Sequence, residues 1–454
     1  MRLFWSLVPC AALLACPETP ADKEETPVDS DTAETDTGDT GDTGLPDYGP
    51  PGCINLEGVT GDFATTAAAA DAAPEGTTVN VCAGAYAEQI LLRKAISVVG
   101  AGSATTSLTP PVGANGIEID AGASVSGFTI LAANHGVVVD DATGVTLTDI
   151  ATDKPAGWGI RAEDATDLTI SMCTFVEPLN GGIDLERSTV LVDSSLFTRP
   201  SGYGIRASEG TELVASNNTF DQVYDNGSQG NSPKKDNDGW SILGRDSSVS
   251  TVENTTTSGT FGGYKVENGA ISMSGDLISG TPNAIIALES AFTADGIEVY
   301  GAIEQGIYAT HPSIPMTLTN STIALNGAET GLVSCSTDYA DFDGFCGGIY
   351  MEMAGVTMSG VSVSDYESFG IVLESALGEV DVPVAIADVA LSNNGRFSFK
   401  LAYGSGTVDG LSVSGHREPD PSVTSPCYYI DQSNGALFVE STIAISNSSF
   451  LDNR

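Results

Sequence analysis

The 454-residue chain carries 60 acidic and 17 basic side chains, which gives it a formal net charge of −43. So acidic a surface repels phosphate groups, which excludes nucleic acid and anionic lipid headgroups as partners. It also disfavours an anionic polysaccharide unless calcium bridges the two, and it favours a soluble monomer. The 52 glycines are typical of a turn-rich β protein.

Residues 1–15 combine one arginine with an apolar run that is too short to span a bilayer, a pattern typical of an export signal. The run ends in Leu-Leu-Ala before Cys16, which resembles the lipobox of bacterial lipoproteins. The resemblance implies cleavage before Cys16, a lipid on its sulfur, and an outer-membrane or cell-surface location. Membrane contact is then expected through the lipid anchor alone.

Residues 16–52 are rich in acids, threonine and glycine and include the run TDTGDTGDTG. They show no apolar periodicity, so no segment can contribute a buried face. Low hydrophobicity with like charges predicts a disordered linker that repels itself and extends.

Residues 53–110 are predicted to hold an N-terminal cap and the first coils of the folded part. Within them, residues 62–74 are rich in alanine, with Asp62 as a candidate N-cap and Pro74 after the end, which predicts a helix. A helix here would cover the open apolar end of a stack of strands. Cys53 and Cys82 flank it, and in an exported protein they predict a disulfide.

The stretch from Trp158 to Phe220 repeats one design in three consecutive segments: WGIRAEDATDLTISMCTF, GGIDLERSTVLVDSSLF and YGIRASEGTELVASNNTF. A marker of glycine followed by an apolar, a variable and an apolar residue recurs at intervals of 23, 23 and 22 residues from Gly136 to Gly204, a period typical of solenoids. The segments are strand-length and separated by polar turns, with no helix-length segment between them. The markers are Gly136, Gly159, Gly182, Gly204, Gly239, Gly263, Ala284, Gly306, Gly348 and Gly370, with weaker forms at Ser398 and Cys427. Residues 111–454 are therefore predicted to form a parallel β-helix of about 12–13 coils whose stacking makes the core.

Residues 69–110 resemble the opening of right-handed parallel β-helix proteins of the pectate-lyase-like superfamily. The resemblance rests on Gly84, Tyr86 and Glu88 after the alanine-rich stretch, and on Val99–Gly102 at the end of the next strand. It implies an all-β, right-handed parallel β-helix with an N-terminal capping helix. The later catalytic signatures of the pectin methylesterases and polygalacturonases are absent, so no catalytic residue is assigned.

Strand alternation sends the residue after each marker inward and the second and fourth residues outward. The predicted inward row is a core ladder of Ile117, Val137, Ile160, Ile183, Ile205, Trp240, Tyr264, Ile285, Ile307, Ile349, Ile371, Phe399 and Tyr428. The second residues are Glu118, Val138, Arg161, Asp184, Arg206, Ser241, Lys265, Ile286, Tyr308, Tyr350, Val372, Lys400 and Tyr429. Acidic fourth residues are Asp120, Asp140, Glu163, Glu186, Glu267, Glu352, Glu374 and Asp431.

These two outward rows have two interpretations. In the structural one, Arg161, Asp184 and Arg206 lie on coils about 4.8 Å apart and alternate in charge, while the acids pair diagonally with the cations. In the functional one, tyrosines stack on sugar rings and charged groups hydrogen-bond sugar hydroxyls. The candidate ligand-binding residues are Arg161, Asp184, Arg206, Lys265, Tyr308, Tyr350, Lys400 and Tyr429, with Glu163, Glu186, Glu352 and Glu374. Neighbouring acids such as Glu163 and Glu186 could approach the separation of about 5 Å of a retaining glycosidase, but any acidic ladder offers such pairs.

Two insertions interrupt the period, at residues 224–238 and 328–346. Cys335 and Cys346 are predicted to close the second insertion with a disulfide. Asp338, Asp341 and Asp343 lie inside that loop and could supply oxygen ligands to calcium, with solvated loop acids as the alternative. No histidine is spaced with another histidine or cysteine as a metal site requires.

The sequence thus predicts a lipid-anchored surface β-helix that binds carbohydrate or acts in adhesion. One alternative is a polysaccharide lyase or glycoside hydrolase that uses the same face, with Lys265 near Glu267 as the nearest candidate for a lyase. Another is a structural surface protein without a ligand.

Overall fold

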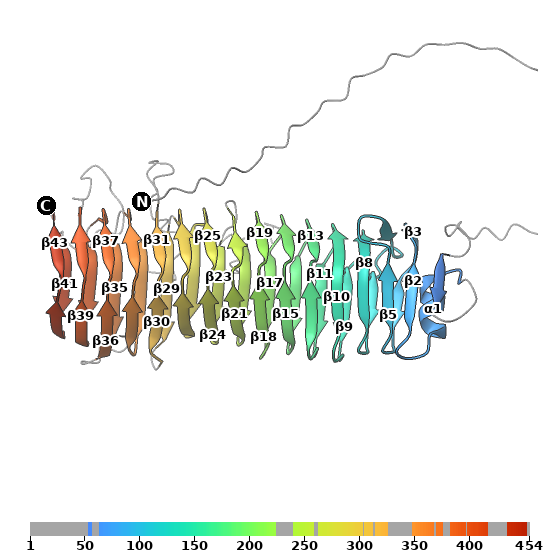
Figure 1. Cartoon of the computed structure of the whole chain (residues 1–454), viewed down its shortest axis with the longest axis horizontal. Helices are drawn as coiled ribbons and strands as arrows, with labels where there is room; N and C mark the ends of the chain where they lie inside the picture. The colour runs from blue at the N-terminus through green and yellow to red at the C-terminus, as the bar shows by residue number, and fades with distance from the viewer. Residues whose placement is uncertain are drawn as a thin grey trace, which may run out of the picture. The chain divides into compact units, whose positions relative to one another are not determined.

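The computed structural model describes residues 53–56, 63–223, 239–257, 262–302, 304–311, 314–325, 347–366, 369–375, 382–395, 397–415 and 434–451. Their strands stack coil after coil, from the blue N-terminal end beside helix α1 (Thr66–Ala72) to the red strands at the C-terminal end (Figure 1). The prediction of an all-β, right-handed parallel β-helix with an N-terminal helix is confirmed. No helix in the described part of the chain is long and apolar enough to cross a bilayer. The predicted export signal, Cys16 and the linker lie outside the described residues.

The strands that carry the glycine markers form one parallel sheet of 14 strands, here called the marker sheet. Its strands are β4 (Ile90–Leu92), β7 (Ile117–Ile119), β9 (Val137–Asp140), β11 (Trp158–Glu163), β14 (Gly181–Glu186), β17 (Tyr203–Ser208), β20 (Trp240–Arg245), β23 (Gly262–Glu267), β26 (Asn283–Leu288), β29 (Gln305–His311), β32 (Gly347–Met353), β35 (Phe369–Ser375), β38 (Phe397–Ala402) and β41 (Asn434–Val439). The first of these, β4, precedes the earliest predicted marker strand.

The other strands form a 29-stranded sheet. It consists of two rows of stacked strands, called the second line and the third line because the marker sheet is the first. The long strands β8 (Ser124–Leu131) and β10 (Thr146–Asp153) belong to both rows and join them. The second line also holds β2 (Thr78–Val81), β5 (Ser97–Gly100), β12 (Leu168–Ser171), β15 (Thr189–Asp193), β18 (Glu212–Ser216), β21 (Ser248–Val252), β24 (Ala270–Ser274), β27 (Ala291–Asp295), β30 (Met316–Thr319), β33 (Val356–Ser359), β36 (Val382–Ala387), β39 (Gly404–Asp409) and β42 (Thr442–Ser446). The third line also holds β3 (Gly84–Tyr86), β6 (Thr106–Leu108), β13 (Thr174–Val176), β16 (Leu196–Thr198), β19 (Thr219–Asp221), β22 (Thr255–Thr256), β25 (Leu277–Ser279), β28 (Glu298–Tyr300), β31 (Thr322–Ala324), β34 (Ser362–Ser364), β37 (Ala390–Ser392), β40 (Ser412–Ser414) and β43 (Ser449–Leu451). A short strand, β1 (Ile54–Leu56), pairs antiparallel with β2.

The marker glycines exist because the core leaves no room for a side chain beside them. A Cβ on Gly182 would lie 2.4 Å from the ring of Phe197 and 2.7 Å from the carbonyl oxygen of Gly204 on the next coil. Phe197 belongs to an internal ladder, with ring centroids 4.8 Å from Phe175 and 4.7 Å from Phe220. The glycine therefore lets the phenylalanine rings and the neighbouring strand approach closely.

The inward row is confirmed for most coils, but the register is wrong at Gly239. Trp240 pairs with Tyr203 on the outer face, Ile242 takes the core position beside Ile205, and Leu243 rather than Ser241 follows Arg206. Ser241 instead occupies the marker position. A serine fits there because this coil has Thr256 where the preceding coil has Phe220, and the Thr256 hydroxyl donates to Ser241 Oγ at 3.1 Å.

The last predicted marker, Cys427, is also wrong. The final marker strand is β41, in which Ala436 lies beside Phe399 and Leu437 beside Lys400. Tyr428, Tyr429 and Asp431 fall outside the described residues. The error arose because an irregular interval precedes this strand, so counting residues could not locate the start of the coil.

Helix α1 is held at both ends by side chains of the first coil. Its N-cap is Thr65, whose side chain accepts from the Ala68 amide, while the predicted cap Asp62 lies outside the described residues. The carboxylate of Glu88 accepts the amides of Thr66 and Ala67, each at 2.9 Å. The ammonium of Lys94 donates to the Asp71 and Ala73 carbonyls at the other end. Glu88 of the Gly-x-Tyr-x-Glu motif thus ties the helix to the solenoid end that it covers.

The predicted partners Cys53 and Cys82 lie opposite one another where β1 meets β2. The Cys82 amide donates to the Cys53 carbonyl at 3.0 Å. A disulfide between them, which this pairing brings within reach, stays a prediction.

Replacing Glu88 with alanine is expected to destabilise the cap by about 1–2 kcal/mol, as loss of a helix cap does. Thr66 and Ala67 would each lose the acceptor of an amide at the first turn of the helix. The melting temperature from circular dichroism should fall clearly for Glu88→Ala and less for Glu88→Gln, which keeps one acceptor oxygen. Glu75→Ala is the control, because Glu75 is exposed; an equal drop in both alanine variants would contradict the capping role.

Candidate ligand-binding face

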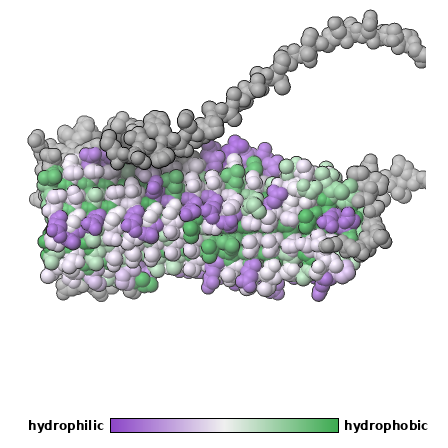
Figure 2. Space-filling view, viewed as in Figure 1, coloured by the Kyte–Doolittle hydropathy of each residue, from purple (hydrophilic) through white to green (hydrophobic). Residues whose placement is uncertain are grey.

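Outward-facing residues of the marker sheet are more buried than outward-facing residues of the second line. In β14, β20, β23 and β26, every residue except the last is buried, outward positions included. In β15 and β18 of the second line, buried residues alternate with exposed ones, as expected of a solvated sheet face. Hydrophilic and hydrophobic residues gather in separate patches along the stack (Figure 2). The outer face of the marker sheet therefore combines an apolar floor with charged groups.

Part of this floor is aromatic. Trp158 and Tyr203 stack with centroids 6.1 Å apart and an interplanar angle of 12°. They lie two coils apart, and Gly181 between them leaves room for the indole, since a Cβ there would meet Trp158 at 2.2 Å. Sequence reasoning missed this row, although Trp158, Tyr203 and Phe369 each stand directly before a marker glycine.

The predicted alternation of Arg161, Asp184 and Arg206 on successive coils is confirmed by the strand register. Arg206 binds Asp184 in a bidentate manner, at 2.7 Å from Nε and 2.8 Å from Nη2. Its guanidinium also lies 4.8 Å from the ring centroid of Trp158, within cation–π range. Burial lowers the pKa of Arg206, but the hydrogen bonds and the charge of Asp184 act in the opposite direction and the pKa is raised overall. The aromatic and charged rows are thus one connected cluster.

Five acids of the fourth row, Asp120, Glu163, Glu186, Glu267 and Glu374, pair with cations, as the structural interpretation predicts, whereas Asp140 and Glu352 have no ion pair among the described residues. Arg161 binds Glu163 at 2.9 Å. Arg187 directly follows the last residue of β14. Its guanidinium binds Glu163, Glu186 and Asp164, and also Glu209 on the next coil at 2.7 Å. Glu163 and Glu186 are neighbours in register, but both are committed to the same guanidinium.

His135 contributes to this cluster although sequence reasoning placed it only in a turn. Its Nδ1 accepts the Trp158 amide at 3.0 Å, so the neutral ring carries its proton on Nε2. Burial, and then the charge of Arg161, lower the pKa of His135, while Asp184 opposes them. The ring therefore orients the backbone of Trp158, and its lowered pKa favours the neutral form.

Lys265 does not suit the role of a catalytic base. Its side chain is 4% exposed, and its ammonium binds Glu267 at 2.7 Å. It also lies 5.9 Å from the ring centroid of Trp240. The neighbouring floor consists of Leu243 and Ile286, both buried. Lys265 is therefore a buried, charge-paired element of the face.

A second cluster lies farther along the stack. Tyr308 and Tyr350 stack with centroids 5.1 Å apart and an interplanar angle of 9°. The Tyr350 hydroxyl donates to Glu374 Oε2 at 3.2 Å, and Lys400 binds Oε1 of the same carboxylate. Burial is the main cause that raises the pKa of Tyr350. Tyr350 is 7% exposed and Tyr308 is half-buried, so Tyr308 presents the more accessible ring of the pair.

The remaining predicted site residues lie outside the described part of the chain. They are Cys16, Tyr429, the calcium candidates Asp338, Asp341 and Asp343, and the predicted disulfide partners Cys335 and Cys346. Within the described ranges, no group of three or more histidine, cysteine or acidic side chains could hold a metal ion. The calcium site stays a prediction.

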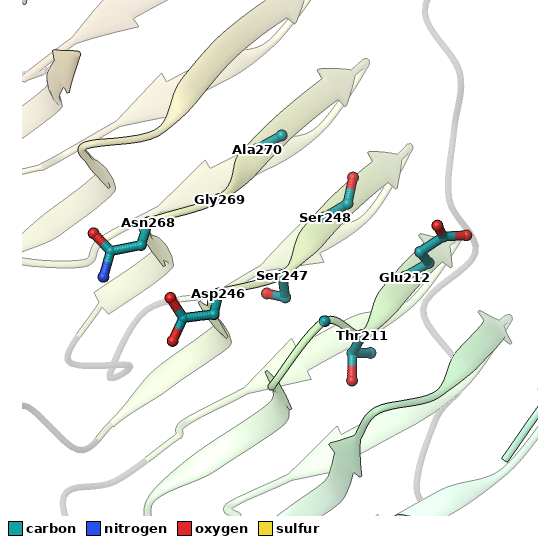
Figure 3. Close-up of a pocket in the computed structure, with 9 residues that line it drawn as sticks. Thr211, Glu212, Asp246, Ser247, Ser248, Asn268, Gly269 and Ala270 are labelled. Carbon is teal, nitrogen blue, oxygen red and sulfur yellow. The ribbon is translucent and has the colours of Figure 1, made fainter. Parts of the chain in front are cut away.

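A shallow pocket of about 320 Å³ lies between neighbouring coils, where marker strands turn into the second line (Figure 3). Glu212, Asp246 and Asn268 line it with small residues, and the side chains of Asp246 and Asn268 extend toward the same side. None of the predicted ligand-binding residues lines it, and its lining has neither a cation nor an aromatic ring. It therefore lacks the chemistry of the marker-sheet face.

Comparison with known protein families agrees with the architecture. A family model described as "Right handed beta helix region" matches residues 115–237. No curated protein matches the sequence. Similar solved structures include an alginate lyase from Paenibacillus sp. (13% identity, TM-score 0.37, 54% of this chain and 91% of that one). A PL6 alginate lyase in complex with a trisaccharide shows 14% identity and a TM-score of 0.47 over 86% of this chain and 85% of that one. The A-module of the mannuronan C-5 epimerase AlgE6 from Azotobacter vinelandii shows 12% identity and a TM-score of 0.38 over 83% of this chain and 93% of that one. The chain thus carries a right-handed β-helix region, matched by the family model over residues 115–237.

Proposed function

We propose that the outer face of the marker sheet binds a polysaccharide that lies along the stack of coils. The observation that carries the proposal is the occurrence on one face of parallel aromatic rings beside partly exposed charged groups: the half-buried Tyr308 stacks on the buried Tyr350, and Trp158 and Tyr203, both buried, stack on one another. Aromatic faces match the apolar faces of sugar rings, and charge-assisted hydrogen bonds suit sugar hydroxyls. The predicted export signal and the lipobox-like residues before Cys16 support display on the outer membrane or cell surface through a lipid anchor.

The charged rim keeps part of its hydrogen-bonding capacity. The side chain of Arg161 is 41% exposed and that of Arg206 is 36% exposed, although each also binds a carboxylate. A guanidinium has five N–H donors, and the bidentate bond of Arg206 to Asp184 uses two of them. Given the net charge of −43, a neutral or cationic polysaccharide suits this face better than an anionic one.

Binding to immobilised polysaccharides in the presence of calcium tests the proposal. Tyr308→Ala is expected to weaken binding about tenfold, the equivalent of about 1.4 kcal/mol, because it removes the more accessible ring of its stacked pair. Tyr300→Ala is the matched control, because Tyr300 lies on β28 of the third line and its hydroxyl bonds only Glu298 in the described structure. Circular dichroism should show that both variants fold.

Absence of saturable binding across neutral, cationic and anionic polysaccharides would contradict the proposal. It would favour instead a structural surface protein without a ligand. The structural interpretation is supported by the ion pairs that Arg161, Arg206, Lys265 and Lys400 all form within the described structure.

A further inference from the structure

Neighbouring acids on the outer face of the marker sheet differ in how their charges are balanced. Strand register places Asp140 beside Glu163, Glu163 beside Glu186, and Glu352 beside Glu374. Glu163 and Glu186 share the guanidinium of Arg187, and Glu163 also binds Arg161. The ion pairs with arginine account for the presence of Glu163 and Glu186, so no catalytic role is needed to explain these two acids.

The pair of Glu352 and Glu374 differs in burial: neither Asp140 nor Glu352 has an ion pair among the described residues, but Asp140 is exposed whereas Glu352 is half-buried. Glu374 binds the Lys400 ammonium through Oε1 and accepts the Tyr350 hydroxyl through Oε2. Glu352 has no hydrogen bond or ion pair among the described residues and is half-buried one coil away. The two carboxyl groups therefore stand side by side in unlike environments, next to the stacked rings of Tyr308 and Tyr350.

We propose that Glu352 and Glu374 are the general acid and the nucleophile of a retaining glycoside hydrolase site within the polysaccharide-binding face. The proposal rests on the proposed function, because the stacked tyrosines must first hold a sugar chain over the pair. Adjacent coils are about 4.8 Å apart, which suits the carboxyl separation of about 5–5.5 Å in retaining glycosidases.

In the first step, the Glu374 carboxylate attacks the anomeric carbon and forms an ester bond to it. The glycosidic C–O bond breaks at the same time, and Glu352 transfers its proton to the departing oxygen. In the second step, the Glu352 carboxylate takes a proton from water as that water attacks the anomeric carbon. The ester bond breaks, Glu374 returns as a carboxylate, and the net reaction consumes one water per bond cleaved with retention of configuration.

The environments of the two acids agree with these roles. Burial, and second the charge of Glu374, raise the pKa of Glu352, which favours the protonated form that a general acid needs. Lys400 binds Oε1 of Glu374 and the Tyr350 hydroxyl donates to Oε2, so both contacts fix the position of this carboxyl group beside the stacked rings.

The test incubates the full chain with xylan, glucomannan, laminarin, dextran and chitosan and measures both binding and the release of reducing ends. We expect cleavage of a bound polysaccharide, with the first product retaining its anomeric configuration in proton NMR. Glu352→Gln and Glu374→Gln should each lower kcat about 100-fold or more while binding and melting temperature stay close to wild type. Glu298→Gln on the third line is the control that should leave turnover unchanged.

A second variant separates chemistry from structure. Glu374→Ala leaves room for azide, which should restore cleavage and yield a glycosyl azide of inverted configuration. Saturable binding without reducing ends, inverted first products of the wild type, or full turnover in the glutamine variants would overturn the hydrolase site and leave the binding face standing. Absence of binding to all five polysaccharides, with no cleavage, would overturn the binding face and the hydrolase site together.

Discussion

Gly182→Ala is expected to destabilise the stack of coils strongly, although it adds only one methyl group. The new Cβ would lie 2.4 Å from the Phe197 ring and 2.7 Å from the Gly204 carbonyl oxygen, far inside van der Waals contact. Phe197 cannot turn aside, because it is fully buried and stacked between Phe175 and Phe220. Overpacking of this kind costs about 1–3 kcal/mol or more.

Urea unfolding followed by circular dichroism measures this loss as a lower midpoint. Gly84→Ala is the matched control, because a Cβ there would meet the Tyr86 ring at 3.5 Å, an ordinary contact distance. We expect the control to change the midpoint little. Equal midpoints for Gly182→Ala and wild type would show that the coils can separate to accept the methyl group, and that close packing is not the reason for the glycine markers.

Two substitutions of Asp276 by residues of similar size are expected to change the stability of the protein in opposite directions: Asp276→Leu should lower it and Asp276→Asn should raise it. The carboxylate is fully buried and accepts the Thr251 hydroxyl at 2.7 Å, the Asn254 amide and Nδ2 at 3.0 Å each, and the Tyr264 hydroxyl at 3.2 Å. Asp276→Leu removes the acceptor of all four donors. Each buried donor left without a partner costs about 1–3 kcal/mol, so a loss of about 3 kcal/mol or more is expected.

Asp276→Asn should instead stabilise the protein at neutral pH. The residue continues a ladder in which the side-chain amides of Asn218 and Asn254 donate to the Val192 and Ala215 carbonyls at 2.9 and 2.8 Å. Thr251 occupies the place of Ala215 one coil on, so an asparagine at 276 would find the equivalent carbonyl. It would keep an acceptor oxygen for the ladder without a buried charge.

The pH dependence follows from burial, the main cause that raises the pKa of Asp276 above its ordinary value. The folded protein therefore binds this proton more tightly than the unfolded chain does. The stabilising contribution is present below the ordinary carboxyl pKa and is lost as the pH rises through the raised pKa. The gain of Asp276→Asn over wild type should thus be largest near pH 7 and shrink toward pH 4, as melting temperatures at both pH values would show. A gain that is the same at both pH values would contradict a charged Asp276 as its cause.

Much of the fold could be predicted because the strand period and the core pattern are local. Alternation sends Ile160, Ile183 and Ile205 inward, and the structure confirms that all three are fully buried. The glycine before each one marks where neighbouring coils approach closely. The alanine-rich segment before β2 likewise predicted the helix α1, because propensity and the need to cover the solenoid end agree there.

The candidate site was predictable only in part. The rows of Arg161, Asp184, Arg206 and the acids followed from counting residues along regular coils. The same counting was wrong at Trp240, which follows the first insertion, and at Tyr428, where the interval between marker strands is irregular. At such strands the register depends on which residue fits at the marker position beside the core. At Trp240 this residue is Ser241, which lies beside Thr256.

By itself, the sequence determined the coil, its inward row and the charged outward rows, because alternation along a strand depends only on neighbouring residues. Tertiary structure alone decided which side chains meet across coils. Trp158 reaches Tyr203 over Gly181, Glu88 caps α1, and Arg187 gathers acids from three coils. Among the described residues, it also left Glu352 without the cation that Glu374 has. Such contacts depend on side-chain length and on the space left by residues about 20 or more positions away, which no local pattern records.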